Sequence, residues 1–452
     1  MLRRLRTAAA FFVPLLVAAQ AAAETAAAPP APGPVDGADT AWVMVSAALV
    51  LLMTPGLALF YGGMVRAKNV LSTLMHSFVC ISLITILWVT IGYSLAFSEG
   101  NPFIGGFEYA FLAGVGAEAG PAAATIPHDI FMLFQLMFAI ITPAIISGAF
   151  AERIKFRAFV GFTLAWSLLV YTPICHWVWG PGGWLSAGSQ WHALDFAGGT
   201  VVHISSGVAG LTMALVLGKR KTEGDTAHQP HNLPLTLLGA GLLWFGWFGF
   251  NGGSALASGG GATHAFVLTH IAAACAALSW MVVERVHSGR ITLLGTASGA
   301  VAGLVGITPA CGFVELPGAL IIGFGAGAVC YFGVQLKNRL KVDDSLDAFG
   351  LHGVGGAFGA IATGLFASAA IGEHAGLFEG GEPRLALNQL VGVVVVAGYS
   401  FVVTLIIAKV LNATVGLRVS AAEEQQGLDE LHGERGYALD HAEAGPSAEA
   451  HA

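Results

Sequence analysis

The fold class of this chain is decided by the stretch Asp195-Phe-Ala-Gly-Gly-Thr-Val-Val-His203-Ile-Ser-Ser-Gly-Val-Ala-Gly-Leu211. It is apolar enough to cross a lipid bilayer, yet it contains an acid and a histidine. Because burying either group in hydrocarbon is costly, such residues usually face a pathway or a partner side chain. A second stretch, Asp347-Ala-Phe-Gly-Leu-His352-Gly-Val-Gly-Gly, repeats this combination in the second half of the chain.

The composition of the chain is typical of a polytopic membrane protein. Of its 452 residues, 55% are hydrophobic and 10% are charged, and the mean hydropathy is +0.73. A soluble domain has about 25% charged residues. The 61 glycines fit close packing of membrane helices, because small residues let the backbones approach. We therefore predict an all-α polytopic membrane protein.

Enzymatic and nucleic-acid-binding motifs are absent from the sequence. The five cysteines are scattered without metal-like spacing, which favours small buried hydrophobes. There is no P-loop, no zinc signature and no activated nucleophile. The net charge of −7 lies in loops and in the C-terminal tail. We expect no enzyme activity, no cofactor, no metal and no nucleic-acid partner.

The first 23 residues have the pattern of a signal peptide. Three arginines form the basic region, and an apolar run from Ala8 to Ala19 precedes small residues suited to cleavage. The alternative is an uncleaved first span, but about 12 apolar residues are few against the roughly 20 that a spanning helix needs. We predict a signal peptide over 1–23 and a flexible arm, rich in Ala, Pro and Gly, over 24–40.

Eleven hydrophobic spans follow the arm. Their approximate limits are 41–62, 69–97, 128–150, 156–179, 195–218, 232–253, 262–283, 291–309, 313–335, 347–369 and 388–411. If the mature N-terminus is outside, every later lysine and arginine except Arg384 falls in a cytoplasmic loop, at the inner end of the last span or in the tail. The positive-inside rule therefore supports eleven spans in the plasma (inner) membrane, with the N-terminus out and the C-terminus in.

The eleven spans of the transmembrane domain, 41–411, divide into five, five and one. We predict one repeat over 41–218, an inverted second repeat over 232–369 and an eleventh helix over 388–411, with the site near the midplane between the repeats. The alternative is chance similarity between two glycine-rich helices. The remaining residues, 412–452, form a polar cytoplasmic tail to which we assign a regulatory role.

The two histidines reach deep into the predicted membrane core from opposite faces. His203 lies roughly 12 Å of helix rise from Asp195, and His352 roughly 7.5 Å from Asp347. An unpaired imidazolium would be expensive there, so we expect both rings to be neutral and able to share a proton by hydrogen bonding. The alternative is that each histidine ties two helices together through a backbone carbonyl.

Aromatic and polar residues converge at the predicted outer face. Trp247, Phe250 and Ser254 share one helix face by their spacing, and topology adds Trp179 and Asp195. Such a group suits a small cation, which the rings attract by cation–π interaction. An interfacial aromatic belt is the alternative for the rings, and helix capping is the alternative for Asp195.

Phe138 and Phe250 are candidates for a hydrophobic constriction in the pathway. Phe138 points inward from the outer face, ten residues past His128 in the third span. Two stacked rings would exclude hydrated ions. For either ring alone, packing in the core is the alternative.

Several motifs of the chain resemble those of the Amt/MEP/Rh family of ammonium transporters, and of its Amt branch in particular. The resemblance runs from about residue 40 to residue 437. The motifs are Phe60-Tyr-Gly-Gly-Met-Val-Arg-Ala-Lys-Asn-Val70, Ala151-Glu-Arg-Ile154, Asp195-Phe-Ala-Gly-Gly-Thr-Val-Val-His203, Trp247-Phe-Gly-Phe-Asn251 and Asp343-Asp-Ser-Leu-Asp347 through His352-Gly353.

The resemblance implies a homotrimer in which each subunit has its own substrate path. It further implies an external ammonium site, a gate, a pore and supporting residues. These are Trp179, Phe138, Ser254 and Asp195 for the site, Phe138 and Phe250 for the gate, His203 and His352 for the pore, and Trp247 and Asp347 as supporting residues.

The tail also resembles the tail of bacterial Amt proteins. The matching segments are Gly416-Leu-Arg-Val419, Gly427-Leu-Asp429 and His432-Gly-Glu434. In those relatives the tail supports docking of a PII signal protein, so the resemblance implies a PII partner of the GlnK type at the cytoplasmic face.

The sequence thus predicts an ammonium transporter that recruits ammonium outside, removes its proton and conducts ammonia past the two histidines, with separate proton transfer. Two alternatives stay open. One is an ammonium sensor coupled to nitrogen signalling. The other is a neutral gas channel for ammonia or carbon dioxide, against which Trp179 and Ser254 argue because such a channel needs no cation site.

Overall fold

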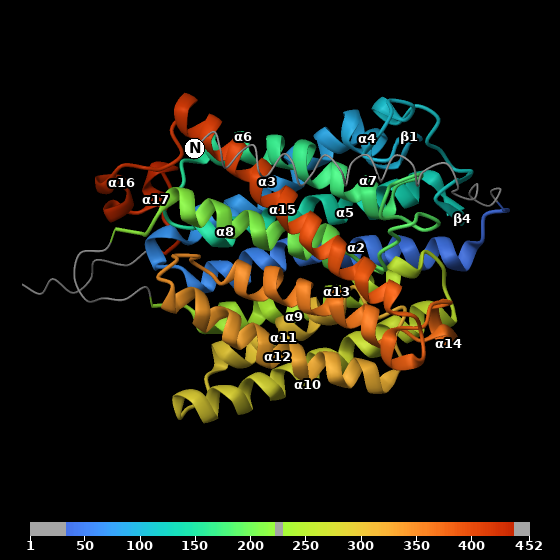
Figure 1. Ribbon diagram of the computed structural model, residues 1–452. Coiled ribbons are helices and arrows are strands. Elements are labelled where there is room, and N and C mark those ends of the chain that lie inside the picture. Colours follow the sequence, from blue (N-terminus) through green and yellow to red (C-terminus); the bar gives the residue numbers. More distant parts are fainter. Residues whose placement is uncertain (1–32, 222–228, 438–452) are drawn as a thin grey trace, which may run out of the picture.

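The computed structural model describes residues 33–221 and 229–437, so the predicted signal peptide over 1–23 lies outside the described residues. Long helices run roughly along one axis and form a bundle (Figure 1). The helices of the bundle are α2 (Gly37–Met64), α3 (Val70–Leu87), α4 (Tyr93–Phe97), α5 (His128–Ser147), α6 (Phe156–Trp166), α7 (Thr172–Trp179), α8 (Ser205–Leu217), α9 (Leu233–Gly252), α10 (Gly260–Ser288), α11 (Leu293–Ile307), α12 (Leu316–Arg339), α13 (Val354–Phe366) and α15 (Pro383–Thr414).

Ten helical segments in the described residues are long and apolar enough to cross a membrane, and α11, with 15 residues, is shorter. Each of the eleven predicted spans overlaps one of these segments. The prediction of an all-α membrane protein is confirmed. The number of crossings and the orientation of the termini stay predictions.

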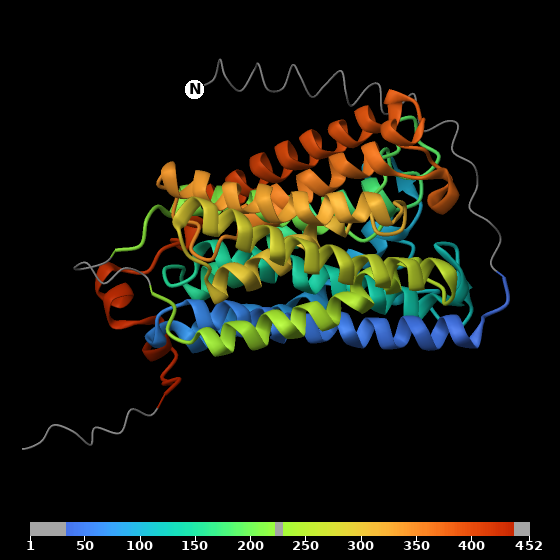
Figure 2. The ribbon, with the colours of Figure 1, turned by 90° about the horizontal axis from the view of Figure 1, so that it is seen from below.

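Short elements gather at the two ends of the bundle (Figures 1 and 2). One end, which we call the tail end, carries α16 (Ala421–Gln426) and α17 (Leu428–Leu431). The other, which we call the cavity end, carries α14 (Ala369–Gly372) and the antiparallel pairs formed by β1 (Gly100–Asn101), β2 (Ile104–Gly105), β3 (Ala119–Gly120) and β4 (Ala123–Pro127).

The N-terminal segment is ordered from Gly33 onward, so the prediction of a flexible arm is wrong over residues 33–40. The N–H of Gly33 donates to the carbonyl of Ala124 at 3.0 Å, and α2 already begins at Gly37. Asp36 caps this helix, because its Oδ1 accepts from the N–H groups of Ala38 and Asp39 at 2.8 and 2.9 Å. The small-residue composition did not reveal these partners.

Both histidine-bearing helices begin with a π-helical turn. The turn η7 (Gly199–Ile204) precedes α8 and contains His203, while η9 (Phe349–Gly353) precedes α13 and contains His352. Turns of this kind are frequent at functional sites, because they re-aim side chains within a helix. The predicted inverted repeat stays a prediction.

Glycines let these two helices cross closely. A Cβ on Gly356 would come within 2.8 Å of the carbonyl oxygen of Gly199 and 2.9 Å of Cβ of His203. Outside this crossing, α2 lies along α9, and the two are seen side by side in Figure 2. The close crossing is what brings His203 near the second half of the chain.

Candidate functional site

Two histidines from different halves of the chain meet inside the bundle. The Nδ1 atoms of His203 and His352 are 3.1 Å apart, and the ring centroids are separated by 5.2 Å. Both side chains are buried. A hydrogen bond between two ring nitrogens requires that one imidazole donates and the other accepts. The structure therefore brings together the two predicted pore histidines.

The space around the histidines is narrow and apolar. A cavity of about 10 Å³ is lined by both histidines and by side chains that include Ile141, Leu243 and Phe250. This is about the volume that one water molecule needs. The Nε2 atom of His203 is buried and has no hydrogen-bond partner among the described residues. One polar atom thus faces a space that fits only a very small neutral solute.

A continuous run of rings leads away from the histidines. The ring of His203 stacks on Phe250 at 5.9 Å between centroids, and Phe250 lies 4.3 Å from Phe138. Phe138 in turn contacts Trp179 edge to face at 5.9 Å. Phe138 and Phe250 are fully buried. The predicted pair of phenylalanines therefore separates the histidines from the residues of the predicted cation site.

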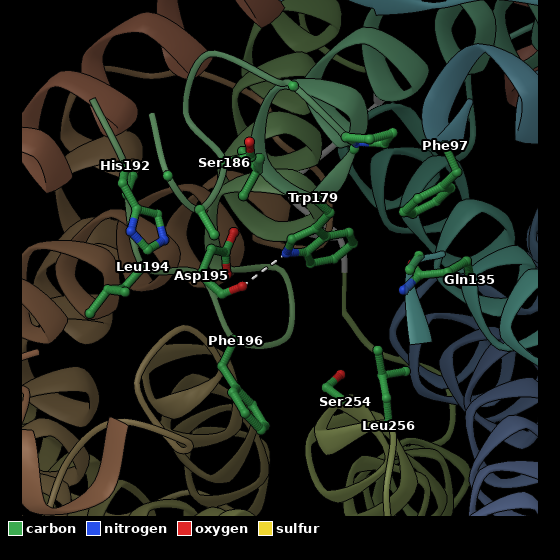
Figure 3. A pocket seen from close by; sticks show the side chains of 18 of the residues that line it. Phe97, Gln135, Trp179, Ser186, His192, Leu194, Asp195, Phe196, Ser254 and Leu256 are labelled. Carbon is green, nitrogen blue, oxygen red and sulfur yellow. Dashed lines mark hydrogen bonds between the residues drawn. The ribbon is translucent and has the colours of Figure 1, made fainter. Parts of the chain in front are cut away.

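A larger cavity, of about 630 Å³, opens at the cavity end of the bundle. Its lining includes Phe138, Trp179, Asp195, Ser254 and the uncharged polar side chain of Gln135 (Figure 3). The hydroxyl of Ser254 donates to the carbonyl of Phe250 at 2.8 Å, which leaves its oxygen free to accept. An aromatic face and an acceptor oxygen in one cavity suit a small cation.

The carboxylate of Asp195 caps the turn η7. Oδ1 accepts from the N–H groups of Gly198 and Gly199 at 2.8 and 2.6 Å, and Oδ2 accepts from the N–H groups of Thr200 and Val201 and from the Thr200 hydroxyl. The backbone carbonyl of Asp195 accepts from the indole of Trp179 at 2.9 Å (Figure 3). Asp195 thus holds the helix of His203 and the ring of Trp179, while its charge stays beside the cavity.

The residue that corresponds to Asp195 in the second half is Asp344, although the helix of His352 begins directly after Asp347, where the predicted span begins. Asp344 is buried, and its carboxylate accepts from the N–H groups of Ala348 and Phe349 at 3.1 and 2.9 Å. Asp347 has a left-handed backbone (φ 60°) and forms an ion pair with Lys337 instead. Asp347 also contacts the turn η9 through its backbone, because its carbonyl accepts from the N–H of Leu351 at 3.0 Å.

Trp247, predicted as a supporting residue, contacts the first of the two histidines. Its ring stacks on His203 at 5.5 Å, and its indole N–H donates to the hydroxyl of Thr308 at 2.9 Å. Asn251 lies beside it and donates to Thr269 at 2.9 Å. Sequence reasoning missed Thr308, and the only signal for it is a lone hydroxyl at the end of an apolar stretch.

One further histidine lines the larger cavity. The ring of His192 lies 5.2 Å from that of His374, and its side chain borders the space that Trp179 also lines. Burial, together with the neighbouring imidazole, lowers the pKa of His192 to about 4. His192 is therefore neutral between pH 5 and 8 and adds no competing positive charge to the cavity.

A buried ion network joins several connecting segments at the tail end. Glu152 accepts from Arg66 and pairs with Arg220 at 3.1 Å, and Arg220 pairs with Asp343 at 2.9 Å. Burial alone would raise the pKa of Glu152, but the two guanidinium groups outweigh it and the pKa lies below the usual value. The pKa of Asp343 is lowered in the same way, chiefly by Arg220.

The tail packs on the bundle through the segment Gly427-Leu-Asp429. The carboxylate of Asp429 accepts from the N–H groups of Leu71 and Ser72 at 3.0 and 2.8 Å, so it caps the start of α3. The N–H of Leu428 donates to the side chain of Asn69 at 2.8 Å. The final residues of the predicted tail, 438–452, lie outside the described residues.

Comparison with known proteins gives matches over most of the chain. A profile of the Ammonium Transporter Family matches residues 41–437. An ammonium transporter of Bacillus subtilis (strain 168) is 54% identical over 403 residues, which cover 88% of this chain and 98% of the relative.

Solved structures agree with this match. The crystal structure of Saccharomyces cerevisiae Mep2 is 38% identical, with a TM-score of 0.79, and the match covers 86% of this chain and 89% of that chain. A structure named Sensor Amt Protein is 28% identical, with a TM-score of 0.80, and the match covers 88% of this chain and 98% of that chain. The resemblance drawn from the motifs is confirmed, and the chain belongs to the ammonium transporter family, whose members are membrane transport proteins.

Proposed function

We propose that the protein recruits ammonium in the larger cavity, removes its proton near Phe138 and Phe250, and conducts ammonia past His203 and His352. The proton crosses separately along the histidines. The proposal rests on the order in which the cavity, the phenylalanine pair and the two histidines follow one another. A cavity with an aromatic face and an acceptor oxygen is followed by a ring pair and then by two hydrogen-bonded imidazoles in an apolar space.

The energetics of desolvation favour this separation of proton and ammonia. A cation in the apolar space around the histidines would lose its hydration without a countercharge, which is costly. Neutral ammonia makes only hydrogen bonds, and the free Nε2 of His203 offers it a partner. In the cavity, by contrast, Trp179 and Ser254 meet the cation before it is stripped of water, and the buried charge of Asp195 lies nearby.

The histidine pair supplies a path for the proton. Each neutral imidazole has one nitrogen that donates and one that accepts, and the Nδ1 contact of 3.1 Å links the two rings. A proton accepted at one ring is passed on as the hydrogen bond between the rings reverses. Transport then moves net charge although the molecule that crosses the pore is neutral.

The test is a current measurement on purified protein in proteoliposomes adsorbed to a solid-supported membrane. An ammonium jump is expected to give a saturable transient, and a potassium jump is expected to give none. His203→Ala is expected to abolish the ammonium transient, because the proton path is cut. An undiminished current in His203→Ala would contradict the proton relay.

The neutral gas channel is distinguished in the same preparation. An uncharged pathway would give no current, but it would alkalinise the vesicle interior faster than in empty liposomes, as reported by a pH dye. The acceptor oxygen and aromatic face of the larger cavity favour the cation-recruiting function over this alternative.

A sensory role is the second candidate, and the similarity to Sensor Amt Protein together with the docked tail favours it. We propose that transport is the main activity and that the tail regulates it. Persistence of nitrogen signalling in a transport-dead variant would assign sensing to the protein itself.

On the family resemblance we further propose a homotrimer in the plasma (inner) membrane, with the cavity end outside and the tail end in the cytoplasm. A PII signal protein of the GlnK type is the proposed partner at the tail end. Native mass spectrometry of the purified protein, alone and with a PII protein, tests both assemblies.

A further inference from the structure

A second large cavity lies at the tail end, and the transport mechanism does not use it. Its volume is about 640 Å³, within the range of roughly 300–1,000 Å³ that is common for small-molecule sites. One wall comes from the bundle, at the starts of α3 and α6, and the other comes from the tail, at 418–432. The isolated bridge between Ile154 and Arg418 joins the two walls at one edge.

The charges that line this cavity are mostly positive. Lys155, Arg157 and Arg418 border it, against one carboxylate, that of Glu423. The carboxylate of Glu423 already accepts from the N–H of Ser420 at 2.6 Å. The guanidinium of Arg418 is engaged by the buried side chain of Glu424 at 2.7 Å.

The two cations on the bundle side, by contrast, form no direct ion pair in the described part of the chain, although Lys155 is close enough to Glu423 to help lower the pKa of that carboxylate. Among residues 33–221 and 229–437, neither Lys155 nor Arg157 forms an ion pair, and Arg157 spends one N–H on the carbonyl of Val415 at 3.0 Å. Several N–H donors of these two side chains thus remain for a ligand. Positive donors of this kind bind phosphate oxygens well.

A buried, unpartnered histidine also lines the cavity. His76 is 2% exposed, and its Nδ1 has no hydrogen-bond partner within the described part of the chain. Its ring packs on Phe159 at 4.4 Å between centroids, which fixes its orientation. Since a buried polar atom usually has a partner, the Nδ1 of His76 is a polar atom beside the cavity whose hydrogen-bonding capacity the described residues leave unused.

We propose that this cavity binds the phosphate group of a small water-soluble phosphate monoester, held mainly by Lys155 and Arg157. From the tail side, the hydroxyl of Ser420 adds a donor. The inference is independent of the proposed transport mechanism. Because the two walls belong to the bundle and to the tail, the ligand stabilises the docked tail.

The position of the two cavity walls indicates from which side the phosphate enters. The tail wall follows the last spanning helix, α15, and the bundle wall includes the connecting segment at 154–155 as well as the helix starts. A ligand in this position enters from the aqueous side of the tail end. We therefore assign the site to a soluble phosphate monoester and not to a lipid headgroup.

The test uses the full-length protein in nanodiscs made of phosphatidylcholine. Binding of glycerol 3-phosphate is measured by isothermal titration calorimetry, with glycerol as the uncharged control. The double variant K155Q/R157Q is expected to weaken binding by about tenfold or more, as is usual when hydrogen bonds to a charged group are lost. The matched control is Arg339→Gln, an exposed cation on α12 outside the cavity, which is expected to leave binding unchanged.

A second measurement uses only the wild-type protein, so it does not depend on how the variants fold. Limited proteolysis of the tail is expected to slow when glycerol 3-phosphate is added and to be unaffected by glycerol. Three outcomes would overturn the proposal. These are no binding of glycerol 3-phosphate at millimolar concentration, equal binding by the double variant, or tail protection that appears only when phosphatidylglycerol is built into the nanodiscs.

Discussion

Asp344 holds the helix of His352 as Asp195 holds the helix of His203. Each carboxylate receives N–H groups of the π-helical turn that follows it, and each is buried. An amide in place of such a carboxylate would put its NH2 group against a backbone N–H, so that two donors face each other. The position of each histidine therefore depends on an acid that never needs to touch the substrate.

Asp344→Asn is expected to abolish most of the ammonium current and to lower the stability by about 1–3 kcal/mol, the usual cost of a buried donor left unsatisfied. The physical reason is that the amide keeps only one acceptor oxygen, so one of the N–H groups of Ala348 and Phe349 loses its acceptor. Asp347→Asn is the matched comparison, and it is expected to be milder because Asp347 accepts none of these N–H groups. The measurements are the ammonium current and the unfolding temperature of both variants. Equal losses of current and stability in the two variants would refute the assignment of the cap to Asp344.

The sequence contained the signal for Asp344, although the spacing argument chose Asp347. Asp344 and His352 are eight residues apart, as are Asp195 and His203. The run Asp343-Asp-Ser-Leu-Asp347 offers three acids, and only the backbone conformation tells them apart. Asp347 adopts a left-handed φ of 60°, which the sequence does not reveal. Local conformation of this kind depends on packing that distant segments provide.

The two histidine-bearing helices can cross closely because glycines, which have no side chain, lie at the crossing point. Gly356→Ala is expected to push η7 and α13 apart, because the new Cβ would lie 2.8 Å from the carbonyl oxygen of Gly199 and 2.9 Å from Cβ of His203. Overpacking of this kind costs about 1–3 kcal/mol. The contact of 3.1 Å between the imidazoles would open, so the ammonium current is expected to disappear while the protein still inserts.

Gly241→Ala is the control for that variant. Gly241 is also inside a helix, α9, but no atom lies within 4 Å of the Cβ that alanine would add. Alanine is favoured over glycine in a helix by about 1 kcal/mol, so this variant is expected to unfold at a slightly higher temperature with an unchanged current. If Gly356→Ala carried wild-type current, close approach of the helices would not be required for transport.

Hydropathy and charge predicted the spanning segments well, because both depend on local composition. Each predicted span overlaps a helical segment, and the two halves bring His203 and His352 together. The sequence did not predict the π-helical turns, because these arise where tertiary contacts shift the backbone register. Helical periodicity gave the face that Trp247 shares with Phe250 and Ser254, but it did not reveal that Trp247 stacks on His203.

Over the whole molecule, polar segments were the least predictable part. The arm at 33–40 and the tail at 416–437 have compositions typical of flexible chain, yet both find partners far away in the sequence. Asp429, for example, caps α3 across 357 residues. The composition of a segment indicates how much apolar surface it can bury. It does not indicate which N–H groups elsewhere in the chain need an acceptor. The tail end is therefore defined by contacts, and its stability is a property of the entire fold.

The pH dependence of stability tests the buried ion network at the tail end, which Glu152 forms with Arg66 and Arg220. Glu152 is fully buried between Arg66 and Arg220, and its pKa is lowered. A carboxylate with a lowered pKa stabilises the fold above its unfolded pKa, about 4.3 for glutamate, and this contribution is lost as the pH falls through the folded value. Glu152→Gln is therefore expected to cost about 3–5 kcal/mol at pH 7, the usual cost of breaking a buried ion pair.

The same variant is expected to approach the wild type in acid, because protonation then removes the charge of Glu152 from both proteins alike. Glutamine also keeps the left-handed backbone of Glu152 (φ 71°), so the comparison isolates the charge from the strain. The measurement is the midpoint of thermal unfolding from pH 3 to pH 8, with Glu434→Gln, an exposed acid in the tail, as the control. If the difference in unfolding midpoint between Glu152→Gln and the wild type stayed constant down to pH 3, the prediction would be wrong. The charge of Glu152 would then make no contribution to the stability of the ion network.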